Sequence, residues 1–263
     1  MARFCVFASS SKGNSSYLSC GGASILIDAG ISCRRICSGI AAVGDDYRDL
    51  DAILITHEHS DHINGLLNLV KKTGAQVFAT APVLEYIISH GHLPADAAVN
   101  EITDSPFEIK GVEVNAFATP HDSIDSVGYR FSLSNGEEVA VATDLGHITD
   151  EVRAGVLGCQ TVLLESNYDA QLLKMGHYPW FLKQRINSEN GHLENTVSAQ
   201  FAAELVKTGT TRLFLGHLSR ENNTPSLARQ AAELTLCQCG AVSGVDFQLE
   251  VAPYDELSKI ARF

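Results

Sequence analysis

The stretch Ala52-Ile53-Leu54-Ile55-Thr56-His57-Glu58-His59-Ser60-Asp61-His62 decides how this chain folds and which chemistry it carries. Its apolar first half predicts a strand over residues 52–56. Its second half places three imidazoles and two carboxylates in six consecutive residues. Neutral imidazoles suit zinc, iron and manganese, and a carboxylate among them adds a hard oxygen and compensating charge. A histidine-rich surface loop is the alternative, but a loop directly after a strand favours a metal site.

The spacing within this loop indicates two neighbouring metal ions. If the strand stops at His57, then His57 and His59 lie on one side of the turn, and Asp61 and His62 reach round to a second position. The ligand types therefore fit a dinuclear hydrolytic centre.

Length and composition predict a single α/β domain over residues 1–263, with 45% hydrophobic and 19% charged residues. No apolar run approaches the roughly 18 residues that cross a membrane, and the N-terminus does not resemble a secretory signal. The seven cysteines are odd in number and lack paired C-x-x-C spacing, so we expect reduced thiols in a cytoplasm.

The formal charge of −12 argues against broad coating of nucleic acid, because phosphate binding depends on clustered lysine and arginine. A local basic track remains compatible with this charge. Residues expected to ring the mouth of the site and bind substrate are Lys12, Lys183, Arg185 and Arg220. Trp180 either packs in the core, which the amphipathic pattern of its helix favours, or stacks on a base.

Strand-like segments alternate with helical patterns along the whole chain, and this order predicts a four-layer αββα sandwich of two packed sheets with helices outside. Asn135-Gly136 marks a hairpin turn between two of the strands. Expected strands cover residues 4–8, 16–20, 23–28, 52–56, 76–79, 107–110, 112–118, 127–133, 138–143, 161–165, 212–215 and 246–251. Expected helices include residues 63–72, 170–175, 179–186, 195–207 and 226–236.

Three further expected strands end in residues of the metal-binding type. His121, Asp144 and His217 each follow an apolar run within a few residues. A lone histidine after a strand is more often an ordinary polar residue, but several such positions in a fixed order favour one shared site at the sheet edge.

Together these residues resemble the metallo-β-lactamase superfamily, whose H-x-H-x-D-H signature is matched by His57, His59, Asp61 and His62. A histidine at position 59 favours the hydrolytic branch, since an oxidising diiron relative would carry glutamate there. The resemblance implies two divalent metal ions (Zn, Mn or Fe). It also implies a ligand set in which His57, His59 and His121 hold one ion, Asp61, His62 and His217 hold the other, and Asp144 bridges.

A finer resemblance is to the YycJ branch, also called WalJ or VicX. It rests on residues 9–15 (SSSKGNS), 164–167 (LESN), 178–186 (YPWFLKQRI), 191–193 (GHL) and 216–222 (GHLSREN). The branch implies a bacterial cytoplasmic 5′-to-3′ exonuclease acting on DNA, with a role in mismatch repair. The chain departs from the usual pattern at Tyr168 and Glu194, where histidine and serine are expected.

The implied chemistry is phosphodiester hydrolysis, with Asp61, His192 and Glu165 as catalytic residues. His192 is a candidate acid for the leaving alkoxide, oriented by Glu165 in a pair that resembles one in transfer-RNA 3′-processing relatives. Alternatively, Glu165 is a buried structural carboxylate that caps neighbouring loops.

Two other functions remain open. One is a hydrolase of a small phosphodiester, thioester or lactone, which the acidic charge and compact length fit somewhat better. The other is a regulatory protein that keeps the fold without turnover, although such a protein has no need of seven aligned metal-binding groups. Fold alone does not separate these functions.

Overall fold

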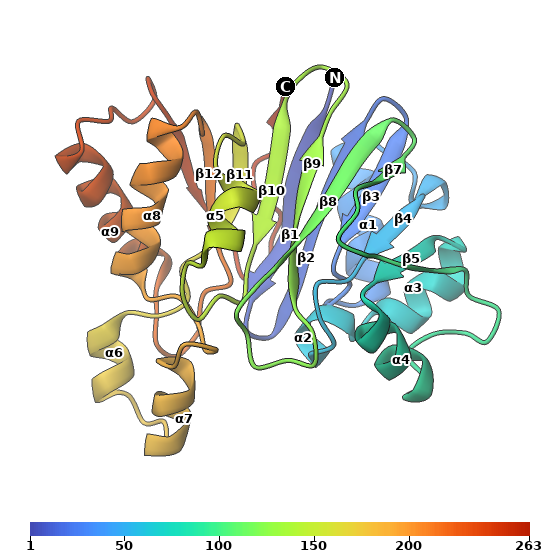
Figure 1. Cartoon of the computed structure of the whole chain (residues 1–263), viewed down its shortest axis with the longest axis horizontal. Coiled ribbons are helices and arrows are strands. Elements are labelled where there is room, and N and C mark those ends of the chain that lie inside the picture. The colour runs from blue at the N-terminus through green and yellow to red at the C-terminus, as the bar shows by residue number, and fades with distance from the viewer.

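The computed structural model describes residues 1–263 as two mixed seven-stranded sheets packed face to face, with helices on both outer faces (Figure 1). Strands of the first sheet, in spatial order, are β14 (Ala261–Arg262), β1 (Arg3–Ser10), β2 (Gly13–Cys20), β3 (Ala23–Ile27), β4 (Ala52–Leu54), β5 (Gln76–Ala79) and β6 (Val99–Glu101). The second sheet has the order β13 (Gln248–Val251), β12 (Arg212–Gly216), β11 (Thr161–Glu165), β10 (Glu138–Ala142), β9 (Val127–Ser132), β8 (Val112–Ala118) and β7 (Phe107–Ile109). The predicted four-layer sandwich is confirmed.

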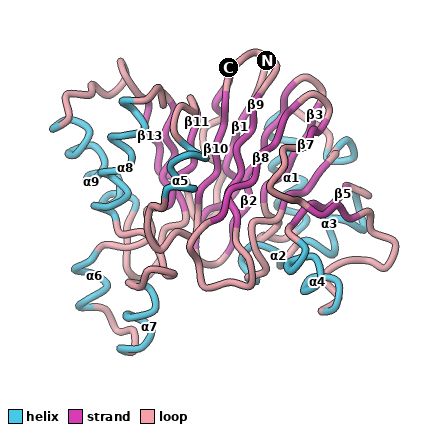
Figure 2. The backbone as a smooth tube through the Cα atoms, in the orientation of Figure 1, coloured by secondary structure: helices cyan, strands magenta, loops and turns pink.

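The outer layers are helical. The first sheet is flanked by α1 (Cys33–Val43), the 3-10 helix η1 (Tyr47–Asp49), α2 (Ser60–Ile63), α3 (Leu66–Thr73) and α4 (Ala81–Ser89). The second sheet is covered by α5 (Asp150–Val156), α8 (Asn195–Lys207) and α9 (Pro225–Gln238), while α6 (Ala170–Met175) and α7 (Trp180–Ile186) extend beyond it as a pair (Figure 2). None of these helices has the length and apolarity needed to cross a bilayer.

Alternation along the strands builds the core. In β1, Phe4 and Val6 face the opposite sheet, whereas Cys5 and Phe7 face the helices that cover the first sheet. Both faces of each sheet are therefore apolar, since successive side chains of a strand point to opposite faces. This double burial explains why the strands read as nearly continuous apolar runs.

Helix ends follow local capping rules. Thr224 accepts a hydrogen bond from the Leu227 N–H and Pro225 opens α9, so both fit the start of that helix. Gly44 ends α1 in the left-handed conformation, which glycine adopts without strain.

Strand direction positions the site. β3 and β4 run parallel in the first sheet, and β10, β11 and β12 run parallel in the second, with β8 in the same sense. Their C-terminal ends meet at one edge of the sandwich, where α2 also lies (Figure 1). Most predicted elements appear within a few residues of their expected bounds, but β6, β14, η1, α2 and α5 were not predicted.

Candidate metal centre

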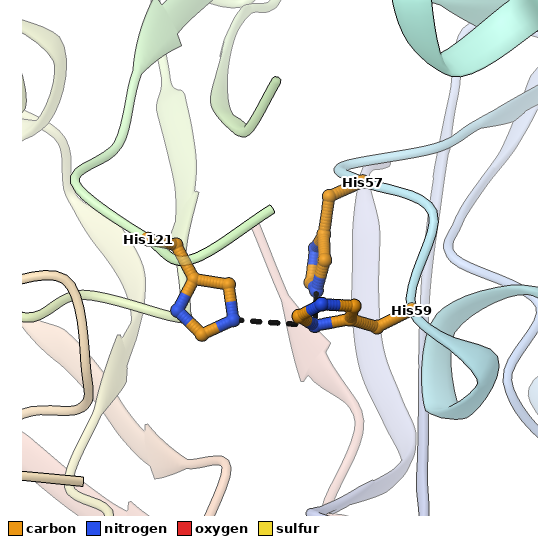
Figure 3. A group of neighbouring side chains, drawn as sticks. All are labelled: His57, His59 and His121. Carbon is orange, nitrogen blue, oxygen red and sulfur yellow. Dashed lines mark hydrogen bonds between the residues drawn. The ribbon is translucent and has the colours of Figure 1, made fainter. Parts of the chain in front are cut away.

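The first group of ligand-type side chains joins the two sheets. His57 and His59 follow β4, and His121 follows β8 of the other sheet. The His57 Nε2 atom lies 3.1 Å from His59 Nδ1, and that atom lies 3.3 Å from His121 Nε2. Figure 3 shows the three rings turned toward a common point. Ring nitrogens that converge in this way can hold one metal ion.

A second group lies beside the first. Asp61 and His62 come from α2, and His217 follows β12. The Asp61 Oδ2 atom is 3.4 Å from His62 Nε2 and 3.5 Å from His217 Nε2. These three residues can hold another ion.

Asp144 lies between the two groups. Its Oδ1 atom is 3.6 Å from His121 Nε2, and its Oδ2 atom is 3.3 Å from His62 Nε2. The carboxylate is buried, and Oδ2 has no hydrogen-bond partner. A buried acceptor left without a partner is costly unless a cation satisfies it, so the donor set fits a metal centre.

The outward-facing ring nitrogens are occupied. His62 Nδ1 lies 2.8 Å from Asp28 Oδ2, and His121 Nδ1 donates to the Gly191 carbonyl at 3.1 Å. His217 Nδ1 lies 2.9 Å from Glu165 Oε1. Such outer contacts fix the ring orientation and direct Nε2 of each ring toward the ligand cluster.

The electrostatics divide the histidines into two kinds. Burial holds the pKa of His57 well below its usual range and also lowers the pKa of His121, so both rings are neutral and ready to bind metal. Burial also opposes protonation of His62 and His217, but nearby carboxylates outweigh it. They raise the pKa of His62 well above its usual range and that of His217 to about 10. Cations would therefore compete with protons for these two rings.

His192 and Glu165 form the expected pair. His192 Nδ1 lies 2.8 Å from Glu165 Oε1, while Glu165 Oε2 accepts the Leu145 N–H at 2.5 Å. Glu165 is fully buried, and Oε1 is shared with His217. The carboxylate therefore orients histidines and also caps a loop, so it makes both kinds of contact that the sequence had left as alternatives.

Asp28 and Asn14 were missed as site residues. Asp28 Oδ1 accepts the Thr56 N–H at 2.9 Å, while Asn14 Nδ2 donates to Asp61 Oδ2 at 3.1 Å. Asp28, Asp144 and His217 all have positive φ, a conformation that side chains rarely adopt and that clusters at functional sites. The available signal for Asp28 was the same as for Asp144, namely an acid directly after an apolar strand.

The four expected substrate cations lie in different settings. Lys12 is exposed at the tip of the β1–β2 turn, and Arg185 pairs with Asp122, the neighbour of His121. Lys183 Nζ donates to the carbonyls of Lys174 and Gly176 at 2.8 and 2.7 Å. Arg220 pairs with Asp255 at 2.5 Å. Arg185 thus lies beside the ligand cluster. Lys183, in contrast, links α7 to the end of α6.

One expectation is wrong. Trp180 does not pack in the core: it is 73% exposed at the start of α7. The apolar residues that actually pair α6 with α7 are Leu173 and Ile186, against which Tyr178 and Leu182 pack. The helical pattern correctly predicted α7 but did not show which of its faces was covered.

Comparisons with known proteins agree with this geometry. A Beta-lactamase superfamily domain matches residues 23–218. Exodeoxyribonuclease WalJ of Streptococcus pneumoniae serotype 2 is 34% identical over 250 residues, which cover 94% of this chain and 93% of WalJ. Exodeoxyribonuclease YycJ of Bacillus anthracis is 33% identical over 249 residues, with 94% and 93% covered. The metallo-β-lactamase fold protein YhfI of Bacillus subtilis superposes with a TM-score of 0.71 at 17% identity, covering 98% of each chain.

The packed sheets and the histidine–aspartate cluster at their shared edge define the metallo-β-lactamase fold, the fold of a superfamily of metal-dependent hydrolases. Within that superfamily, this chain belongs to the family that includes WalJ and YycJ.

Proposed function

We propose that this protein is a metal-dependent phosphodiesterase acting on DNA, and specifically an exonuclease that removes nucleotides from the 5′ end. The observation that carries the proposal is the position of Asp144 between two histidine–aspartate groups in a chain 34% identical to WalJ over 94% of its length. A buried carboxylate in contact with both groups is what two adjacent cations require.

The proposed ligand set assigns His57, His59 and His121 to one ion and Asp61, His62 and His217 to the other, with Asp144 shared. When bound, the pair of divalent cations would activate a water molecule and neutralise charge on the phosphoryl group. Histidine and carboxylate ligands accept zinc, manganese and iron, so the mixed donor set leaves all three as candidates.

The remaining steps fall to residues of the chain. Glu165 holds Nδ1 of His192, which leaves Nε2 of that ring able to donate a proton to the leaving alkoxide. His192 is partly exposed and can therefore meet a substrate. The proposed phosphate contacts are Lys12, Lys183, Arg185 and Arg220. Arg185 is the best supported of the four, because it pairs with Asp122 directly next to His121.

The test is degradation of end-labelled DNA. Metal-free protein is reconstituted with manganese or zinc and assayed beside an Asp61→Ala control, with bis(p-nitrophenyl) phosphate as a second substrate. Stepwise loss of nucleotides from the 5′ end that vanishes in the control is the expected result. Hydrolysis of the small ester alone would instead indicate a small-molecule hydrolase, and inactivity on both would indicate a regulatory protein of this fold.

The proposal also covers the location, the biological role and the domain organisation of the protein. None of the seven cysteines is paired, which supports a cytoplasmic location. A role in DNA repair is suggested by the family resemblance, and a single domain over residues 1–263 is supported by the continuous core between the sheets. Identity of the metal in the cell is testable by metal analysis of the purified protein.

A further inference from the structure

The segment 168–187, here called the helical arm, projects from the edge of the sandwich that carries the metal centre (Figure 1). It consists of α6 and α7 joined by a short turn. Its small core of Tyr168, Leu173 and Ile186 holds the two helices together. The two helices of the arm therefore pack on each other through a small apolar core.

The helical arm exposes large apolar side chains to solvent. Trp180 is 73% exposed, Phe181 is 70% exposed and Met175 is 80% exposed. Beside Trp180 lies a pocket of about 200 Å³, whose walls include Tyr168, Lys174 and Lys183. Exposed aromatic residues beside lysines form the kind of surface on which unpaired nucleobases stack while their phosphates meet cations.

Charge on the helical arm is opposite to that of the whole chain. Three of the 19 lysines and arginines lie in it (Lys174, Lys183 and Arg185), but only Asp169 of the 31 acidic residues does. That acid is occupied as the cap of α6, where it accepts the N–H groups of Gln171 and Leu172. Arg185 pairs with Asp122 outside the arm, so the arm and this partner together keep one net positive charge. On a chain with a net charge of −12, this local positive charge favours a polyanion as the occupant.

The helical arm contacts the metal centre close to His192 and His121. The His192 N–H donates to the carbonyl of Ile186, the last residue of α7, at 2.9 Å. Arg185 pairs with Asp122 next to His121, and Gly191 accepts from His121 at 3.1 Å. Trp180 and Ile186 are separated by roughly 9 Å along the helix axis, from a rise of about 1.5 Å per residue. About three stacked bases at ~3.4 Å each would cover that distance.

We infer that Trp180 and Phe181 form a stacking site for unpaired nucleobases of the DNA strand whose end lies at the metals. This inference rests on the proposed function and adds to it a preference for single-stranded ends. Lys174 would contact the backbone of the same strand, because it lines the pocket beside Trp180.

Fluorescence gives a direct test, because Trp180 is the sole tryptophan of the chain. Metal-loaded protein is titrated with a phosphorothioate-linked thymidine oligonucleotide, which resists hydrolysis, and with an abasic oligonucleotide of equal length. Stacking predicts quenching by the first and little change with the second. Equal quenching by both would overturn the inference, since the abasic strand offers phosphates without bases.

Variants supply the second test. Trp180→Ala and Phe181→Ala are each expected to raise the Kd for the thymidine oligonucleotide roughly 10-fold or more, with Trp180→Phe retaining most of the affinity. Val245→Ala, at a similarly exposed apolar position before β13, is the control and leaves the Kd unchanged. A Kd unaffected by the arm variants would overturn the inference. So would sedimentation showing a dimer that Trp180→Ala no longer forms, since the aromatic residues would then be covered by a second copy of the chain.

The outcomes also separate this inference from the proposed function. Degradation of end-labelled DNA by a protein whose Trp180 fluorescence does not respond to bases would remove the stacking site alone. Base-dependent quenching without any degradation would keep the stacking site and remove the nuclease activity.

Discussion

Each buried charge at the metal centre is held by partners that come from several strands. Asp144 contacts imidazoles from both ligand groups, and those imidazoles outweigh its burial and hold its pKa well below the usual range. The Glu165 Oε1 atom contacts Nδ1 of both His192 and His217. A substitution at Glu165 would therefore disturb both histidines, whereas substitutions at His192 and at Asp144 should separate proton transfer from metal binding.

The first prediction contrasts His192 with Asp144. His192→Ala should slow turnover roughly 10²- to 10⁴-fold while leaving metal content unchanged, because only proton donation is lost. Asp144→Asn should lose metal as well as activity, and asparagine tolerates the positive φ at this position. Metal analysis beside DNA degradation measures both, with Asp104→Asn on an exposed loop as the control. Equal loss of metal in the two variants would rule out the acid role of His192.

The second prediction concerns Asp28, which positions His62 through a contact of 2.8 Å. Asp28→Asn keeps the shape and the left-handed backbone but removes the charge, so metal affinity at the Asp61–His62–His217 group should fall roughly 10- to 100-fold. Titration with zinc should then show one tight and one weakened site. Asp51→Asn, at the opposite end of the β3–β4 pair, should keep two tight sites. Two unchanged sites in Asp28→Asn would contradict the positioning role.

At the scale of elements, the loop after β3 and the loop after β4 are packed backbone to backbone. Ala29 N–H donates to the His62 carbonyl at 2.8 Å, and Gly65 N–H donates to the Ala29 carbonyl at 2.7 Å. A Cβ atom on Gly30 would lie 1.6 Å from the Asp61 carbonyl oxygen. The absence of a side chain at Gly30 is thus what allows α2 to bring its ligands to the sheet edge.

The third prediction follows from that contact. Gly30→Ala should lower the free energy of unfolding by more than about 3 kcal/mol, because backbone atoms would have to move apart. Gly136→Ala has open space around it but a φ of +83°, so it should cost only about 1 kcal/mol. Urea unfolding of both variants checks the difference. Similar small losses of unfolding free energy in the two variants would show that the loop carrying Asp61 moves away from residue 30 at little cost.

At the scale of the whole molecule, burial between layers also affects cysteines far from the metals. Burial raises the pKa of the Cys5 thiol to about 11 and that of Cys159 to about 12, from an ordinary value of 9.0. Both thiols pack in layers between a sheet and its helices. The folded protein therefore holds these protons more tightly than the unfolded chain does.

The fourth prediction is a loss of stability in alkali. Because the folded pKa is raised, the stabilising contribution is complete below about pH 9 and declines as pH rises toward 11 or 12. At about pH 10.5 the loss from Cys159 is roughly 2 kcal/mol, from 1.36 kcal/mol per unit of pKa. Urea midpoints at pH 8 and 10.5 should therefore differ less in Cys159→Ala than in the exposed control Cys237→Ala. Equal differences in the two variants would contradict this account.

The sequence by itself determined the layered fold and most of the candidate site. Apolar runs of strand length set the sheets, since buried strands need apolar side chains on both faces. Residues 57–62, together with the polar residues that follow three other strands, indicate the ligand cluster through their residue types and spacing alone. These signals are local, and each can be recognised within a few residues of its own strand.

Only the tertiary structure decided which distant groups complete the site. Asp28 reaches His62 from the end of the neighbouring strand, and Asn14 reaches Asp61 from a position 47 residues away in sequence. The exposure of Trp180 likewise depends on how α6 packs against α7, because an amphipathic pattern shows that a helix has an apolar face without showing what covers it. Contacts between residues far apart in the chain are set by packing, so no local pattern encodes them.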